Sequence, residues 1–336
     1  MDPEFERRLT EQADGALSKL LGDGADAKLG PADIAGLEAV VRTDGSRPVL
    51  FVEDDFVDLM APSVGDYAAR LSRFEDAVRQ VCRSVGRVDD PSPPAQPLGY
   101  QGTAWVVAEG LVVTNYHVLE AIAPGGVRVG GRFEGRLNTG VAVHFGNEVG
   151  DPRPERRFPI RRVVSVGRAG APEHRHPELT GVNFDGLDLA VLELEPVPGR
   201  PFPQPNRIAR GDDPLTRGGL ASAGRGVYLV GYPGNEHSTT PDLFVKIFAG
   251  VKSFKRLAPG TIMAAPGSVP HDMRHWIFTH DASTLGGNSG SAVADFDADG
   301  QTLLGLHFAG HHARQNWAHA LERVTHELQS VLPAVI

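Results

Sequence analysis

Residues Ser283–Ser291 read Ser-Thr-Leu-Gly-Gly-Asn-Ser-Gly-Ser, and they join the apolar runs Trp276–Phe278 and Ala292–Ala294. Glycines on both sides of Ser289 permit backbone conformations that are closed to other residues. They also let main-chain N–H groups turn outward beside the hydroxyl, as an oxyanion hole requires. The same residues equally describe an ordinary turn. A nucleophile is therefore favoured only if a general base and an orienting carboxylate lie elsewhere in the chain.

The composition is that of an ordinary globular protein. The chain has 336 residues, of which 41% are hydrophobic and 22% charged, and this length suits two or three domains. A net charge of −9 argues against a nucleic-acid partner, which would require a basic face. The 40 glycines and 26 prolines fit many short strands joined by tight turns.

The apolar runs and the cysteine content indicate the cellular location. The longest apolar runs are too short to span a bilayer, so we expect no membrane contact. Cys82 is the only cysteine, which excludes an intrachain disulfide. No charged-then-apolar leader precedes the first predicted helix, and this favours a cytoplasmic location.

Residues 1–88 predict a mostly helical module, with residues 1–5 set aside as an expression scar from cloning sites. Apolar residues recur at helical spacing in 6–21 and 31–41, and Ser63–Asp66 resembles the start of a helix that Gly86 can end. No cluster here suggests chemistry. Either a prosegment-like inhibitor or an adaptor for a regulatory protein partner would fit. Its carboxylates predict a solvated acidic face formed by Glu53, Asp54, Asp55 and Asp58.

Two sets of short β runs follow a Pro-rich linker at 89–98. The first set predicts a β-barrel over 99–200 and comprises Gly102–Val107, Leu111–Thr114, Val127–Val129, Val141–Phe145, Ile160–Val166 and Leu187–Leu194. The second predicts a barrel over 201–317 and comprises Val227–Gly231, Leu243–Phe248, Thr261–Met263, Trp276–Thr279, Ser291–Phe296 and Leu303–Phe308. An amphipathic helix closes the chain over 318–336. The fold class is thus mainly β, with two antiparallel barrels or sandwiches of about six strands each.

Two further residues have the chemistry that a nucleophilic serine requires. His117 follows the apolar run of the strand Leu111–Thr114, where its imidazole can accept and return a proton near neutral pH. Asp188 begins an almost wholly apolar run, where a carboxylate is costly unless it is paired, and an imidazole N–H is a suitable partner. Asp185 is the rival carboxylate, but its neighbours predict a loop.

His117, Asp188 and Ser289 occur in the order His…Asp…Ser, which differs from the subtilisin and α/β-hydrolase orders. The blocks Thr114–His117, Asp188–Leu192 and Gly287–Ser291 resemble the three signature blocks of trypsin-like serine peptidases of the chymotrypsin fold. The resemblance covers about residues 99–320. It is closest to the bacterial branch with Gly-Asn-Ser-Gly-Ser, which includes the glutamyl endopeptidases. It implies two six-stranded β-barrels.

The resemblance also implies the role of each residue, with no metal or cofactor. Ser289 would attack the scissile carbonyl, His117 would act as general base and acid, and Asp188 would orient the imidazole. The backbone N–H groups of Gly287 and Ser289 would form the oxyanion hole. Asn288 departs from the animal digestive members, which carry an Asp there to capture a new N-terminal ammonium. Activation by that route is therefore not expected.

The same resemblance implies a substrate pocket built from the strands on both sides of the nucleophile loop, namely Ser283, Thr284, His307, Phe308, Ala309 and Gly310. Thr284 and His307 match positions where glutamyl endopeptidases carry Thr and His, so a substrate side-chain carboxylate would fit. The alternative is that His307 is a core histidine and that the pocket accepts small or apolar side chains. Phe308–Gly310 could pair with an extended substrate by strand addition.

Two groups of histidines invite a metal site, which we do not expect because they lack a full ligand set at ligand spacing. They are His307, His311 and His312, and His271, His275 and His280. The sequence thus predicts a serine endopeptidase that acts on protein or peptide substrates. The alternative is a catalytically silent binding protein of the same fold.

Overall fold

The computed structural model describes residues 46–92, 99–129, 132–150, 152–171, 174, 182–211, 220–234, 241–311 and 315–331. The expression scar and the helices expected at 6–21 and 31–41 lie outside the described residues, as does 332–336. Within the described ranges, every helix is too short or too polar to cross a bilayer.

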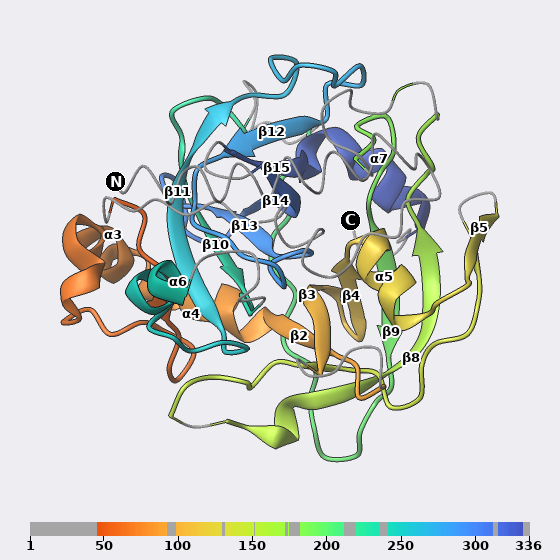
Figure 1. Cartoon of the computed structure of the whole chain (residues 1–336), viewed down its shortest axis with the longest axis horizontal. Coiled ribbons are helices and arrows are strands. Elements are labelled where there is room, and N and C mark those ends of the chain that lie inside the picture. Colours follow the sequence, from red (N-terminus) through yellow and green to blue (C-terminus); the bar gives the residue numbers. More distant parts are fainter. Residues whose placement is uncertain are drawn as a thin grey trace.

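The first barrel closes on itself in the strand order β2-β3-β4-β9-β8-β7 (Figure 1). Its strands are β2 (Val85–Asp89), β3 (Tyr100–Ala108), β4 (Leu111–Thr114), β7 (Ala142–His144), β8 (Arg157–Val166) and β9 (Ala190–Leu194). All six pairings are antiparallel.

The second barrel has the order β11-β10-β13-β14-β15-β12 and closes through a β11–β12 pairing. Its strands are β10 (Gly226–Gly231), β11 (Arg256–Ala264), β12 (Ile277–His280), β13 (Ala292–Asp295), β14 (Leu303–His311) and β15 (Gln315–Ala320). The expected mainly β class with two antiparallel six-stranded barrels is confirmed. A short strand, β1 (Leu50–Phe51), pairs with β11 from outside the barrel.

The membership of the strand sets differs from the prediction. The first barrel begins at Val85, ahead of the Pro-rich stretch, because the helix α4 (Glu75–Ser84) ends just before Gly86 and the chain continues at once as β2. The predicted strand Val127–Val129 is β5, which forms a separate two-stranded hairpin with β6 (Arg132–Glu134). This hairpin lies at the right edge of Figure 1.

In the second half, one prediction was wrong and one helix boundary differs from the prediction. Residues Leu243–Phe248 belong to the helix α6 (Pro241–Phe248) and not to a strand. Pro241 suits a first helical turn, and the run Leu243–Val245 has no polar residue, so its periodicity could not separate the two structures. The closing helix α7 (Leu321–Val331) begins three residues later than predicted, because the residues up to Ala320 pair as β15.

The chain from Ser46 to Ser84 forms a strap on the outside of the second barrel. After β1 it contains a 3-10 helix, η2 (Pro62–Tyr67), and the helices α3 (Ala68–Arg73) and α4. Leu50, Val52 and Leu71 are fully buried against the barrels. Figure 1 shows α3 at the left edge, on the side of β10 and β11. The other helices are α5 (Tyr116–Ile122) and the 3-10 turn η4 (Pro154–Arg156).

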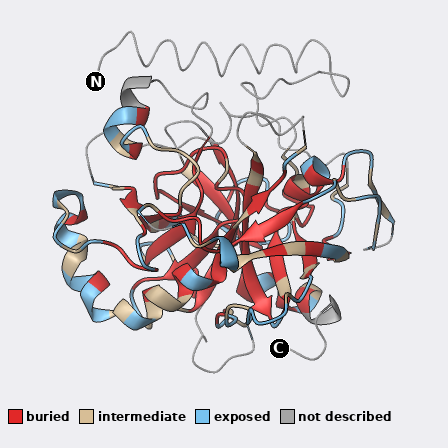
Figure 2. Cartoon of the chain, turned by 90° about the horizontal axis from the view of Figure 1, so that it is seen from below, coloured by how far each residue is buried: buried red, intermediate tan, exposed pale blue. Residues whose placement is uncertain are grey.

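The alternation of side chains along a strand separates the cores. Ala104 and Val106 of β3 point into the first barrel, whereas Trp105 and Val107 join a cluster shared with the second barrel and the strap. The strands are therefore buried on both faces where the barrels meet, and Figure 2 shows this buried centre beneath helices of mixed exposure.

A buried polar cluster joins the strap to both barrels. Lys255 Nζ donates to Glu148 Oε1 at 2.8 Å and to the carbonyl oxygens of Cys82 and Phe145, each at 2.7 Å. Asp55 N donates to Glu148 Oε2 at 2.9 Å. Because every charge in this cluster is paired, its burial is tolerated.

The predicted solvated acidic face is wrong at Asp55, whose side chain is only 1% exposed. The guanidinium groups of Arg156, Arg153 and Arg83 surround it at 2.6, 3.2 and 3.1 Å. Burial alone would raise the pKa of Asp55, but hydrogen bonds from Arg156 and Arg83 and the charge of Lys255 lower it to about 2. Glu53, Asp54 and Asp58 are exposed, as predicted.

Candidate active site

His117 and Asp188 are joined by two hydrogen bonds at one end of the first barrel. His117 Nδ1 lies 2.6 Å from Asp188 Oδ2, and the backbone N–H of His117 donates to Asp188 Oδ1 at 3.0 Å. β4 pairs with β9, so the chain that leaves β4 and the chain that enters β9 meet at one end of the barrel. His117 lies in the first turn of α5, which directly follows β4. The sequence prediction that these two residues pair is thus consistent with the geometry.

The carboxyl group of Asp188 is held ionised. Burial would raise its pKa, but the charge of His117 and the hydrogen bonds from it outweigh burial and lower the pKa to about 2. An ionised carboxylate on Nδ1 fixes the proton there and leaves Nε2 as the basic nitrogen of the neutral imidazole.

Ser289 lies in a loop of the second barrel that packs on the first. Thr103 N of β3 donates to Ser289 O at 2.8 Å. A Cβ on Gly290 would lie 2.0 Å from Thr103 O and 2.6 Å from Thr114 Oγ1, so only glycine permits this approach. Thr114 precedes His117 by three residues. The loop is therefore held against the strand that leads to the imidazole.

Gly287 takes a backbone conformation that suits an outward N–H. Its φ is +100°, and a Cβ there would lie 2.5 Å from Tyr232 O. Its carbonyl accepts a hydrogen bond from Thr103 Oγ1 at 2.8 Å, which fixes the peptide that joins it to Asn288. Among the described residues, the N–H of Gly287 has no hydrogen-bond acceptor.

The predicted pocket residues Ser283, Thr284 and His307 lie in and beside β12 and β14 and are buried. His307 Nδ1 lies 3.3 Å from Nε2 of His280. Burial and the neighbouring His280 lower the pKa of His307 well below its ordinary value, so this imidazole is neutral at neutral pH. Thr284 Oγ1 donates to Asn316 Oδ1 at 2.7 Å, and Ser283 Oγ donates to the carbonyl oxygen of Arg47 at 2.8 Å.

The last residues of β14 extend beyond β13, its partner strand on one side. His307–His311 pairs with β15, whereas the pairing with β13 ends at Leu306. Phe308 and Ala309 are only 6% and 7% exposed. On the β13 side, Phe308–Gly310 therefore faces no paired strand among the described residues.

A family model for the trypsin-like peptidase domain matches residues 102–306. The chain belongs to this family. A probable serine protease of Lysobacter enzymogenes is 29% identical over an alignment of 327 residues, which covers 93% of this chain and 79% of that protein. The two six-stranded barrels therefore have the chymotrypsin-like fold, and the expected family is confirmed.

Solved structures of the Rv3671c protease from M. tuberculosis are distant neighbours of this trypsin-like peptidase. Its active form has 20% sequence identity and a TM-score of 0.41, covering 76% of this chain and 83% of that one. An inactive form of a mutant has 19% identity and a TM-score of 0.42, covering 77% and 91%.

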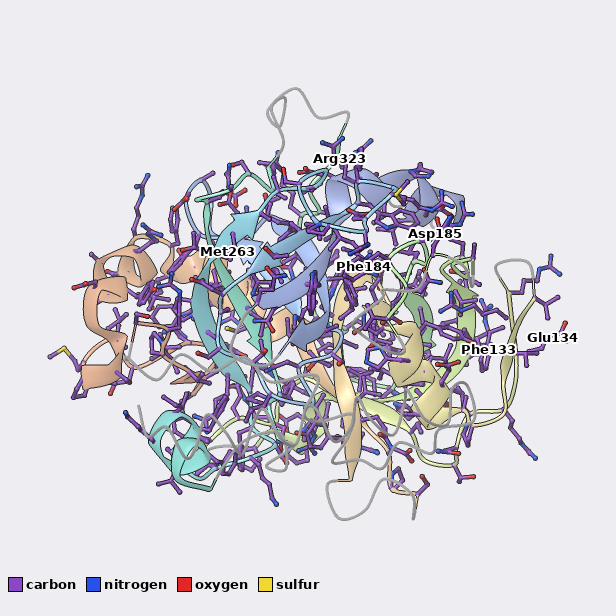
Figure 3. All side chains as sticks on the ribbon, turned by 45° about the horizontal axis from the view of Figure 1, so that its top comes forward. Phe133, Glu134, Phe184, Asp185, Met263 and Arg323 are labelled. Atoms are coloured by element: carbon purple, nitrogen blue, oxygen red, sulfur yellow. The ribbon has the colours of Figure 1, made fainter. Side chains whose placement is uncertain are left out.

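The rival carboxylate Asp185 of this trypsin-like peptidase has a different partner. Arg274 Nε lies 2.6 Å from Asp185 Oδ1. Trp276 Nε1 of the same loop donates to Phe184 O at 2.7 Å. Figure 3 labels Phe184 near the centre of the view and Asp185 to its upper right, whereas Glu134 lies at the right edge. Asp185 therefore joins a second-barrel loop to the chain ahead of Asp188.

The histidines do not gather into a metal site within the described part of the trypsin-like peptidase. No group of three or more His, Cys, Asp or Glu side chains there could hold a metal ion. His271 and His275 lie exposed in a loop, and His280 faces His307 inside the second barrel. His312 lies outside the described residues.

Sequence reasoning missed three residues that contact the site of this trypsin-like peptidase, namely Arg47, Asn316 and His319. Asn316 and His319 fall in or beside the stretch predicted as a helix, and the alternation of Asn316, Ala318 and Ala320 with Trp317 and His319 is a weak strand signal. Arg47 is 234 residues from its partner Asp281, and no local pattern could connect them.

Proposed function

We propose that this trypsin-like peptidase is a serine endopeptidase in which Ser289, His117 and Asp188 form the catalytic triad. The observation that carries the proposal is the 2.6 Å hydrogen bond between His117 Nδ1 and Asp188 Oδ2, opposite a glycine-bounded serine loop. Ser289 Oγ attacks the scissile carbonyl while His117 Nε2 takes its proton and passes it to the leaving amine. Asp188 holds the imidazole in the required tautomer.

The oxyanion of the tetrahedral intermediate is bound by the N–H groups of Gly287 and Ser289. One such donor is typically worth about 10²–10³ in rate. The positive φ of Gly287 and the hydrogen bond that its carbonyl accepts from Thr103 support this role. No metal or cofactor is required for these steps.

The substrate is a protein or peptide in extended form. The unpaired side of Phe308–Gly310 offers main-chain donors and acceptors, and a substrate strand adds there. This places the residue before the cut next to Ser283, Thr284 and His307.

The residue before the cut is acidic, since an imidazole N–H of His307 can bind a carboxylate, and the Thr284 hydroxyl can join it once its proton turns away from Asn316 Oδ1. Without substrate, His307 is neutral and can offer only a hydrogen bond. A bound substrate carboxylate favours protonation of the His307 imidazole. The alternative is a pocket for small or apolar side chains, in which His307 and His280 serve only as core residues.

Replacement of the nucleophile tests the proposal. Ser289→Ala should lower kcat on casein by about 10⁶-fold and abolish labelling by a fluorophosphonate. Ser165→Ala is the matched control, because Ser165 Oγ is buried in the first barrel and has no hydrogen-bond partner among the described residues, so its loss is nearly neutral. A folded wild type that is not labelled would support the silent binding protein instead.

A peptide library that varies the residue before the cut tests the specificity. Preference for Glu or Asp that is lost in His307→Leu supports the acidic pocket. Preference for Ala or Leu in the wild type supports the alternative.

A further inference from the structure

His319 is a buried histidine of the second barrel that contacts the carboxylate residue of the first. It lies on β15, opposite Leu306 and Ile277 in the neighbouring strands. The backbone N–H of Asp188 donates to His319 Nε2 at 3.1 Å. This hydrogen bond crosses between the two barrels.

The ring of His319 is held in place from two directions. It stacks on Phe308, with 4.3 Å between the centroids and 18° between the planes. Trp276 contacts it edge-on at 6.2 Å, and the indole N–H of Trp276 is itself bonded to Phe184 O. Side chains of β14, β15 and the loop before β12 therefore form one aromatic group around this imidazole.

The hydrogen bond defines the tautomer of His319. An N–H donor from Asp188 requires a lone pair on Nε2, so the proton of the neutral ring is on Nδ1. Burial lowers the pKa of His319 to about 4, although the charge of Asp188 opposes this and that of Arg128 adds to it. The acceptor is thus available throughout the neutral range.

Asp188 is held at four points. Its two carboxylate oxygens bind His117, and its carbonyl oxygen accepts a hydrogen bond from Asn115 Nδ2 at 2.9 Å. The three groups that bind these atoms all belong to the first barrel. His319 supplies the fourth contact, and it comes from the second barrel, which also contributes Ser289.

We propose that His319 is a positioning residue, which fixes the main chain of Asp188 from the second barrel and so sets the orientation of the His117–Asp188 pair toward Ser289. This inference rests on the proposed function. The nucleophile and its base come from different barrels, and an error of about 1 Å in their mutual placement can cost about 100-fold in rate. A contact from the nucleophile's own barrel to the carboxylate residue reduces that error.

The main test is His319→Phe, which keeps a ring on Phe308 and removes the acceptor. We expect kcat per titrated active site to fall by about 10- to 100-fold with a smaller change in KM. His319→Gln places an amide oxygen near the position of Nε2 and should restore kcat to within about threefold of wild type. His319→Leu serves if the Phe variant does not fold.

Two readouts separate positioning from mere structural support. A support role lowers the fraction of labelled sites but leaves kcat per site and the acid limb of the kcat/KM profile unchanged. A positioning role shifts that acid limb to lower pH in His319→Phe, because a displaced Asp188 stabilises the imidazolium less. His144→Leu is the matched control, since His144 is a buried histidine of β7 that is bonded to Arg153 O.

Failure of this inference is distinguishable from failure of the proposed function. Wild type that cleaves casein while His319→Phe keeps both its kcat and its pH profile overturns only the positioning role. If the wild type shows no turnover, the far-downfield NMR signal of the proton between His117 and Asp188 still tests the positioning role of His319. A signal unchanged in His319→Phe overturns the inference, and one that broadens or moves supports it.

Discussion

At the scale of single residues, the site depends on which carboxylate faces the imidazole. Asp188 and Asp185 are three positions apart, yet one binds His117 and the other binds Arg274. Each carboxylate is partly buried and paired, so burial alone would not tell them apart. The partner decides the chemistry that each can support.

Asp188→Asn should lower kcat by about 10⁴-fold while the protein remains folded. The Asn carbonyl can still accept from the backbone N–H of His117, but its NH₂ group then faces Nδ1 and favours the wrong tautomer. Steady-state kinetics normalised to fluorophosphonate-labelled sites measure this. Asp185→Asn is the control and should lower stability without changing kcat per site. Equal losses of kcat in the two variants would contradict the assignment.

The sequence predicted the triad residues from their immediate neighbours, and their roles stay predictions. His117, Asp188 and Ser289 each lie beside an apolar run or a glycine turn, and these local patterns predicted where each would lie. Arg47 and His319 could not be found in this way, because their contacts join segments 234 and 131 residues apart.

At the scale of elements, the strap supports the wall of the proposed pocket. Arg47 Nε and Nη2 bind both carboxylate oxygens of Asp281, at 2.8 and 2.7 Å, and the carbonyl of Arg47 accepts from Ser283. Asp281 follows β12 directly and precedes Ser283 by two residues. The start of the described chain is thus bound to the segment that leads into the nucleophile loop.

Arg47→Ala should lower the free energy of unfolding by about 3 kcal/mol, because it leaves Asp281 buried without its counter-charge. It should also raise KM for peptides with a large side chain before the cut. Urea denaturation and kinetics on matched peptides measure the two effects. Arg161→Ala is the control, since this exposed ion pair with Glu193 should contribute less than about 1 kcal/mol. No difference between the two variants would exclude the supporting role.

Truncation of the N-terminal region at Gly99 and at Ser46 should have opposite effects on folding. A chain that starts at Gly99 lacks the strap and β2, so its first barrel cannot close, and we expect it to be insoluble or unfolded. A chain that starts at Ser46 keeps both barrels. Far-UV circular dichroism and casein cleavage compare them. Faster cleavage from the Ser46 start than from the full chain would indicate that residues 1–45 inhibit, and unchanged cleavage favours an adaptor.

The elements that were predicted wrongly share a physical cause. β2, α6 and β15 are only five to eight residues long, and so few residues cannot distinguish a period of 3.6 from a period of 2. Each predicted set nevertheless contained six runs, because one run that is no barrel strand, Val127–Val129 or Leu243–Phe248, took the place of one missed strand, β2 or β15.

At the scale of the whole molecule, buried ionisable groups make stability depend on pH. Burial lowers the pKa of His280 to about 4, so between roughly pH 4 and 6.5 the unfolded chain binds more protons than the folded one. Stability therefore falls as pH decreases through this window. Asp55, with its pKa lowered to about 2, adds a further loss as pH falls below about 4.

His280→Phe should reduce the loss of unfolding free energy between pH 7 and pH 5 by about 2 kcal/mol. Urea denaturation at the two pH values measures this. His326→Gln is the control, because the side chain of His326 is 70% exposed. An identical pH dependence in wild type and His280→Phe would show that His280 is not kept neutral by the fold.

The pairing of β1 with β11 has a consequence for biosynthesis. Leu50 lies opposite Leu257 in the register, so about 200 further residues must leave the ribosome before the strap finds its binding surface. Until then the nascent chain carries an apolar segment without a docking site, which is the kind of surface that chaperones shield. Maturation of this enzyme is thus set by the arrival of its second half.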